Sequence, residues 1–593
     1  MFVRTKTTPN SPRKSIQIVE NDRDQKTGKV KQKILRHVGI AMDDSEEDKL
    51  KQLALEIMQK IQLEKNAHSS QHSLFSEPTE QEVLDHIKKK AGRKAKKRIE
   101  DVLPISEVTL DMIVEESRIV DGVHEAAGHL YDTLGYKNIL RNGKYNSILK
   151  DLVLCRISNP TSKLATNNLL KRYYMREHDI DSMYRTMDHV FDNIDKIKLR
   201  TFNSTLNLMP DGVEIILFDV TTLHFESTQV DELRKFGYSK NFRFNTTQVV
   251  LALATNTDGL PVGYELFEGN KAEVRTLIAT IDKWKQQFNI KDVTFIGDRA
   301  MFSSDNLDEL DKRNYKYIVA AKLRVLPKVM QDKIMNPEQG SVALIQEDAA
   351  WYGEFMYQEK DISALRDNNE KPEKIKKYKE LIEKNKERRF IVSCSSARAH
   401  HDFKKRNTIL EKIEKQLDKT SNSAKLVSNT GLKKYTTSVG KAKTSIDQNK
   451  IDSDARWDGI HGVITNMPGG TNNLLHILAQ YKRLVKIEDC FRVNKSTLKM
   501  RPIYHFKPER IHAHVAICYM AFAVIRQLEY RTKLVKKLSV ASIIEELNSV
   551  QSSIYIHKVT KDRYRVPGSF SNNARKIYSA IGLERNLDAC PLI

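Results

Sequence analysis

The sequence predicts an α/β protein whose central domain is a mixed β-sheet covered by helices. Strand-like apolar runs gather between residues 213 and 321, and the first three follow one another without an intervening helix. The later runs alternate with helical patterns. Strands joined by short turns form antiparallel meanders, whereas strand–helix–strand units pair in parallel. The expected order is therefore strand, strand, strand, helix, strand, helix, strand in one sheet.

Each of these elements has its own signal in the sequence. The first three strands are VEIILFDVTTLHFES, TTQVVLALAT and LPVGYELFEG, and the turn Asn256–Gly259 between the last two is a strong hairpin signal. Helical periodicity follows in AEVRTLIATIDKWKQQF, and then again in SSDNLDELDKRN after the strand DVTFIGD. The strand YKYIVAA completes the predicted sheet.

The chain of 593 residues is too long for one hydrophobic core, so several domains are expected. In chain order they are a small β-rich N-terminal piece with a helix (1–66), a polar and basic linker (67–106), a helical region that could bind DNA (107–210), the first part of the sheet domain (211–324), a β-containing insertion domain (325–470), the second part of the sheet domain (471–530) and a helical C-terminal region (531–593). We expect the insertion to project from the core rather than to continue its sheet.

Two of these segments have alternative interpretations. The basic run DHIKKKAGRKAKKRIED is either a solvated linker or an arm that binds the DNA backbone, and the sequence favours neither. The helices of 107–210 could form a helix-turn-helix DNA reader, but a plain packing domain is at least as well supported for any one of them.

The charge of the chain favours a polyanionic partner. Lys and Arg number 99 against 77 Asp and Glu, so the net charge is +22, and neutralising nucleic-acid phosphates drives binding. A ribosome-associated or merely soluble basic protein fits the charge as well.

The five cysteines form no C-x-x-C pair, which fits a reducing compartment. The longest apolar run, Val515–Ile525, is shorter than the roughly 20 residues of a membrane span, so no membrane partner is expected.

Two aspartates end apolar runs of the predicted sheet. Asp219 follows Ile215–Phe218, and Asp298 follows Val293–Gly297. A carboxylate in such a setting is costly unless it is paired or binds a metal. Either residue alone could be a strand-end turn or a helix cap. Because strand-end carboxylates of one sheet can lie side by side and gather oxygen ligands for Mg²⁺, the pair predicts a metal site.

A third acid, Glu488, lies in the helical stretch QYKRLVKIEDCFRVNKSTLKMRP. On an ideal helix Tyr481, Glu488 and Lys495 form one stripe, because each step of seven residues falls about 20° short of two turns. On the same wheel Arg492 lies about 40° from Glu488 and Arg483 about 140° away. The alternative is a solvated helix face with an ordinary i,i+4 pair of Glu488 and Arg492.

The three acids with these flanks resemble the DDE transposases of bacterial insertion sequences, in particular the insertion-sequence-four superfamily with its Tyr, Arg, Glu, Lys signature. Tyr481, Glu488 and Lys495 match the spacing of that signature, whereas Leu484 stands where its Arg is expected. Stretches such as FDVTTLHFES, GDRAMFSSDNL and RPIYHFKPERIHAHVAI are also similar to sequences of such proteins, so the resemblance covers most of the chain.

This resemblance implies an RNase H-like core and phosphoryl transfer with two Mg²⁺ ions, for which Mn²⁺ can substitute. Asp219 would bridge both metals, while Asp298 and Glu488 would each hold one. The residues expected to contact DNA are Tyr481, Arg492, Lys495, Arg299 and Arg501. The expected partners are the terminal inverted repeats of the element and target DNA, bound by a homodimer in the bacterial cytoplasm at the nucleoid.

Two rival functions remain. A metal-dependent nuclease with the same core would cut DNA without joining it. A catalytically inactive relative would bind DNA alone, but the three intact acids argue against this alternative.

Overall fold

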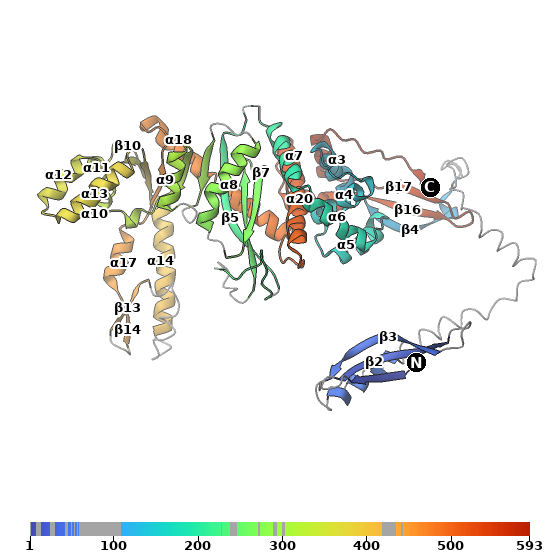
Figure 1. Cartoon of the computed structure of the whole chain (residues 1–593). Coiled ribbons are helices and arrows are strands. Elements are labelled where there is room, and N and C mark those ends of the chain that lie inside the picture. Colours follow the sequence, from blue (N-terminus) through green and yellow to red (C-terminus); the bar gives the residue numbers. More distant parts are fainter. Residues whose placement is uncertain are drawn as a thin grey trace, which may run out of the picture. The chain divides into compact units, whose positions relative to one another are not determined.

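The computed structural model describes residues 2–7, 14–23, 30–41, positions between 46 and 58, 108–210, 212–226, 228–237, 246–270, 273–288, 293–298, 303–417, 434–439 and 443–592. The chain divides into two compact units, Met1–Arg98 and Ile99–Ile593 (Figure 1). The predicted linker and its basic run lie outside the described residues, as does Arg299.

The N-terminal unit contains a small antiparallel sheet. Its strands are β1 (Phe2–Thr7), β2 (Lys14–Arg23) and β3 (Val30–Ala41), in that order. Ile16, Ile18 and Ala41 are fully buried in its core, together with Ala54 from the helical positions that follow.

A nine-stranded mixed sheet forms the centre of the second unit. Its order is β10-β11-β12-β15-β9-β8-β5-β6-β7. The strands are β5 (Ile215–His224), β6 (Gln248–Thr255), β7 (Pro261–Glu268), β8 (Thr294–Gly297), β9 (Lys316–Ala320), β10 (Ala343–Glu347), β11 (Ala350–Phe355), β12 (Arg389–Ser395) and β15 (Ile460–Thr465). β5, β6 and β7 are antiparallel neighbours, whereas β5, β8 and β9 pair in parallel. With α8 (Glu273–Phe288) and α9 (Ser304–Lys312) between the parallel strands, the predicted element order is confirmed.

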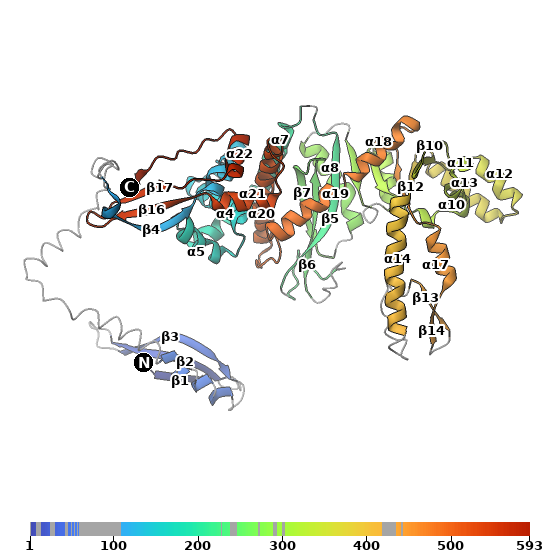
Figure 2. The same cartoon turned by 180° about the vertical axis from the view of Figure 1, so that it is seen from behind.

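Helices cover both faces of this sheet, and Figures 1 and 2 view it from opposite sides. The apolar side chains of α8 and α9 pack on one face. The other face is covered by α18 (Thr471–Lys482), α19 (Val485–Arg492) and α20 (Pro508–Lys533). Among the described helices, α20 alone has the length and hydropathy of a membrane span, but 94% of its apolar window is buried inside the protein. Its side chains therefore form a core.

The prediction that 325–470 would not continue the central sheet is wrong. β15 pairs antiparallel with β9, and β12, β11 and β10 extend the sheet beyond it. Without β15, β9 would be an edge strand with unpaired N–H and C=O groups, which are a template for an added strand. The remaining elements of the segment are α10 (Lys328–Met335), α11 (Pro337–Gly340), α12 (Lys360–Asp367), α13 (Pro372–Lys384), α14 (Ser396–Leu417), β13 (Thr436–Val439), β14 (Lys443–Ile446) and α17 (Gln448–Ala455).

A helical region precedes the sheet in sequence and packs around α20. It contains α3 (Gly128–Thr133), α4 (Gly143–Ser158), α5 (Lys163–Tyr174), α6 (Ile180–Phe191) and α7 (Ile194–Leu206), and α4, α6 and α7 contact α20. Asp151 is fully buried in α4, where its carboxylate accepts hydrogen bonds from Arg176 (2.7 Å) and His178 (2.7 Å) and lies 3.3 Å from His124. This cluster holds α4 against the turn that follows α5.

The prediction of a helical C-terminal region is wrong, because that region contains three strands, and the mostly helical region before the sheet also contributes one strand. β16 (Gln551–His557) pairs with β4 (Ile113–Val120), and β17 (Arg563–Pro567) and β18 (Cys590–Leu592) complete a four-stranded sheet. The helix α21 (Val540–Ser549) precedes β16, and α22 (Asn572–Ala580) lies between β17 and β18. β16 and β17 are close in sequence, but β4 pairs with β16 more than 400 residues later, so no local signal predicts that β4 joins this sheet.

Candidate active site

Asp219 and Asp298 occupy neighbouring positions on two parallel strands. β5 and β8 are in register from Ile215 opposite Thr294 to Phe218 opposite Gly297. The next pair in this register is Asp219 and Asp298. Because neighbouring strands lie about 4.8 Å apart, the backbones of the two aspartates come within reach of one shared ligand. The predicted side-by-side position of these two residues is thus supported by the register.

The face of the sheet to which Asp219 points follows from alternation along β5. Leu217 and Leu223 pack with α18, α19 and α20, whereas Ile216 and Phe218 pack with α8. Side chains two residues apart share a face, so Asp219 and Thr221 face the α19 side. Asp219 is half-buried there, and its Oδ1 accepts a hydrogen bond from the Val220 amide (2.7 Å).

α19 contacts β5 and carries two adjacent acids with different surroundings. Asp489 pairs with the buried guanidinium of Arg526 (2.6 Å) and also with Lys486 and Arg492. Burial raises the pKa of Asp489, but the hydrogen bond and the charge of Arg526 lower it more, so this pKa lies below its usual value. Glu488 is exposed and makes no ion pair within the described part of the chain. Asp489 therefore anchors α19 to α20, and Glu488 remains available for a ligand.

The ideal helix assumed from the sequence is interrupted twice, so the angles predicted from Glu488 to Tyr481, Arg483 and Lys495 do not hold. Glu488 and Arg492 both lie within α19, so neither interruption separates them. α18 ends at Lys482, and Leu484 donates to Tyr481 in a tighter i to i−3 bond before α19 begins. After Arg492 the backbone widens into a π-helical turn, Val493–Thr497, in which Leu498 donates to Val493. A tight turn and a π turn each change the rotation per residue, and periodicity in the sequence reveals neither.

Lys495 nevertheless reaches the face of β5 that carries Asp219. Its ammonium donates a hydrogen bond to Thr221 Oγ1 and lies 5.3 Å from the centre of the Phe491 ring. Thr221 stands two residues beyond Asp219, about 7 Å along the strand. A positive charge therefore lies beside the first aspartate. Sequence reasoning did not identify Thr221, although its position two residues after Asp219 is a usable signal.

The structure places Arg492, Tyr481 and Arg501 at three separate positions. The side chain of Arg492 is 71% exposed and pairs with Asp489, while Arg483 is exposed at the end of α18. Tyr481 lies against His461 of β15 with 5.5 Å between ring centroids, and burial lowers the pKa of His461 to about 4. Arg501 is half-buried and lines a cavity away from α19.

Among the residues that the structure describes, no three His, Cys, Asp or Glu side chains are grouped so that they could hold a metal ion. Asp219 and Asp298 come together through strand register, whereas Glu488 comes from a helix above them. The donor set itself suits a hard divalent cation, since all three side chains are carboxylates.

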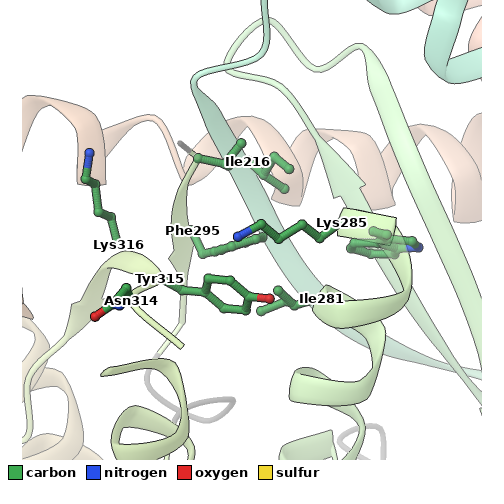
Figure 3. A pocket seen from close by; sticks show the side chains of 9 residues that line it. Ile216, Ile281, Lys285, Phe295, Asn314, Tyr315 and Lys316 are labelled. Carbon is green, nitrogen blue, oxygen red and sulfur yellow. The ribbon is translucent and has the colours of Figure 1, made fainter. Parts of the chain in front are cut away.

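A small cavity of about 40 Å³ lies on the opposite face of the sheet (Figure 3). Ile216, Ile281 and Phe295 line it, and the Lys285 ammonium lies 4.4 Å from the centre of the Tyr315 ring. This volume suits little more than a water molecule. The cavity is therefore separate from the acidic face and too small for a nucleotide.

Comparisons with known proteins identify the chain. Residues 211–524 match the family model described as "Transposase DDE domain", and residues 2–68 match "IS1634 family transposase, N-terminal domain". The second match is to a family other than the insertion-sequence-four superfamily, so the narrower resemblance is not shown. No curated protein matches the chain.

Two transposase–DNA complexes are similar at low identity. A piggyBac transposase synaptic complex with hairpin DNA is 8% identical over 72% of this chain and 77% of that chain, with a TM-score of 0.34. The Mos1 transposase paired-end complex is 14% identical over 42% of this chain and 70% of that chain, with a TM-score of 0.14. These scores are too low to support an inference about this chain.

Proposed function

Because this chain belongs to the transposase DDE domain family and is a DNA transposase, we propose that Asp219, Asp298 and Glu488 are the acids of its active site. The register of β5 and β8 carries the proposal, because it aligns the two aspartates on adjacent strands. The strand order is β9-β8-β5-β6-β7, in which β6 runs antiparallel to both β5 and β7, and β8 and β9 run parallel to β5. This is the arrangement expected of an RNase H-like core.

Glu488 supplies the third carboxylate from α19. Asp489, its neighbour, is committed to Arg526 and Lys486, so it is poorly placed to exchange its partners for a metal. The exposed side chain of Glu488 makes no ion pair with the residues described and is able to turn toward β5 when DNA and metal bind. The choice of Glu488 thus rests on the different surroundings of two adjacent acids.

The three carboxylates fit two divalent cations, Mg²⁺ in the first place. Such ions, when bound, activate a water or a 3′-hydroxyl and stabilise the leaving oxygen. β5 pairs with β8 and contacts α19, so Asp219 is the acid that we assign to both ions. Asp298 and Glu488 would each hold one. No side-chain nucleophile is needed for this reaction.

Positive groups around the acids would hold the DNA backbone. Lys495 is fixed next to Asp219 by its hydrogen bond to Thr221, so it would neutralise the phosphate at the reacting bond. Arg492 is exposed on α19 and would exchange Asp489 for a phosphate, to which its planar fork is suited. Tyr481 would contact the DNA strand beside Lys495 and Arg492. The DNA would be the element's terminal repeats and a target, held by a dimer.

The variant Asp219→Asn tests this proposal. We expect cleavage of end-containing DNA in Mg²⁺ to be abolished, while DNA affinity changes little because affinity comes from basic residues. Asp348→Asn, an exposed carboxylate between β10 and β11 of the same sheet, is the matched control and should cut at the wild-type rate. A strand-transfer assay with a pre-cut end separates a transposase from a nuclease. Wild-type cleavage by Asp219→Asn would refute the assignment.

A further inference from the structure

A cavity of about 360 Å³ opens between the helical region and the segment that follows α19. It is lined by Arg156 of α4, by Thr161 to Lys163 at the start of α5, and by Lys499, Arg501 and His505 of the later segment. No acidic residue lines it. Its volume lies within the range of small-molecule sites, roughly 300–1,000 Å³. Neither the acids nor the proposed phosphate contacts on α19 use this cavity.

Two of its cations are buried without a countercharge. Lys163 is 5% exposed and Arg156 is 6% exposed. Arg156 donates one hydrogen bond to the Thr161 carbonyl (3.1 Å). In the ranges that the structure describes, neither side chain forms an ion pair with a carboxylate. Buried Lys and Arg side chains are almost always paired, so this arrangement requires an explanation.

The arrangement is unfavourable in the absence of a ligand. Burial lowers the pKa of Lys163 to about 7, and the charge of Arg156 adds to this effect. Burial also lowers the pKa of His505 to about 3, with Lys163 and Arg156 contributing. The charge of Arg156 thus disfavours protonation of both Lys163 and His505. An anion in the cavity would attract these cations and so offset their mutual repulsion.

The backbone at the cavity also favours an anion. α5 begins at Lys163 and runs for 12 residues, and the Ser162 hydroxyl accepts a hydrogen bond from the Ala165 amide (3.3 Å). By helix geometry, the amides of Lys163 and Leu164 have no acceptor within the helix. A helix N-terminus with free amides attracts phosphate. The helix end and the two buried cations are independent features that point to the same ligand chemistry.

We propose that this cavity binds a phosphate group of the DNA on which the transposase acts. The proposal rests on the DNA transposase function but not on the identity of the three acids. Ile503 of the same segment donates to the His224 carbonyl (3.4 Å) and forms a parallel bridge beside Phe225, so the cavity adjoins the end of β5. His224 is five residues beyond Asp219, about 17 Å along a strand. At about 3.4 Å per nucleotide, this span is about five nucleotides from the reacting bond.

Thermal unfolding of the full chain without divalent metal tests the proposal. Inorganic phosphate should raise the Tm of the wild type, because a ligand that binds the folded state stabilises it. Lys163→Met should have a higher Tm than the wild type without phosphate, since it removes an uncompensated buried charge, and should lose the response to phosphate. Lys171→Met, on the exposed face of the same helix, should behave as the wild type. A merely structural lysine would instead give a lower Tm when replaced.

DNA binding distinguishes the source of the phosphate. For Lys163→Met, the slope of log K against log[salt] should decrease in magnitude by about 0.9, the loss of one phosphate contact. A phosphate response with an unchanged slope would mean that free phosphate, not DNA, is the ligand, and would overturn the proposal. Should Lys163→Met not fold, Lys499→Met at the exposed rim of the cavity must weaken the phosphate response. Asp219→Asn should keep the full response, and its loss there would place the anion at the acids and refute a separate site.

Discussion

The variants Glu488→Gln and Asp489→Asn distinguish the two adjacent acids of α19. Both changes remove one negative charge and preserve the shape of the side chain. Glu488 is exposed and unpaired within the described structure, so Glu488→Gln should leave thermal stability unchanged. If Glu488 holds a metal, the same change should reduce DNA cleavage by at least about 10²-fold.

The expected effect of Asp489→Asn follows from its pairing. Arg526 is 1% exposed and lies 2.6 Å from Asp489 and 2.5 Å from Glu529. Breaking a buried ion pair costs about 3–5 kcal/mol. Because Glu529 remains and the Asp489 side chain is 26% exposed, we expect a loss of about 1–2 kcal/mol. Cleavage well below the melting temperature should fall by less than about tenfold, because α19 keeps its apolar contacts with β5.

Both variants are measured in two assays, thermal unfolding and cleavage of labelled end DNA in Mg²⁺. Gel-shift affinity is measured at one salt concentration, since charge changes alter DNA binding by themselves. A stable Glu488→Gln protein that cuts normally, together with an Asp489→Asn protein that binds DNA but does not cut, would transfer the third position to Asp489. It would also mean that Arg526 releases Asp489 when DNA binds.

Three further outcomes are expected. Arg492→Ala should lower the cleavage rate by about 10²-fold, and Arg483→Ala should lower it much less. Single-turnover assays on one substrate measure both rates. Equal losses would contradict a phosphate contact by Arg492. Asp151→Asn should destabilise the helical region by about 2–3 kcal/mol in urea unfolding. Burial raises the pKa of Asp151, but its hydrogen bonds with His124 and His178 lower it more, so its stabilisation is present above the unfolded pKa of about 3.9 and is lost as the pH falls. The variant should accordingly show a weaker loss of stability in acid. Removal of divalent metal with EDTA should stop cleavage, and added Mg²⁺ should restore it, whereas cleavage in EDTA would exclude the metal-dependent reaction.

The central sheet was predictable because its signals are local. Apolar runs, the turn at Asn256–Gly259 and alternation with helices specify the order of β5 to β9, and the structure has that order. The position of Asp219 and Asp298 at adjacent strand positions follows from the same pattern, once the two strands are assumed to be parallel neighbours. This part of the prediction therefore depends on local sequence signals and on one assumption about strand pairing.

The parts that were missed depend on pairing between distant segments or on backbone irregularity. β15 joins β9 about 145 residues later, and the alternation in 460–465 does not say which strand it will meet. The prediction that Tyr481 and Lys495 lie on one stripe of an ideal helix fails for a different reason. A tight turn and a π turn between these two residues change the rotation per residue. The contact of Lys495 with Thr221 joins residues 274 positions apart and is visible only in three dimensions.

The pairing of β4 with β16 has a consequence for how the protein is made. Val120 lies opposite Gln551, so a ribosome must add about 431 residues after β4 before its partner exists. At 5–20 residues per second this takes about 20 to 90 seconds. During that time β4 presents an unpaired strand edge, which is a template for aggregation. A nascent chain that stops before β16 would retain this edge, so fragments ending there should be substrates for chaperones and proteases rather than competitors for DNA ends.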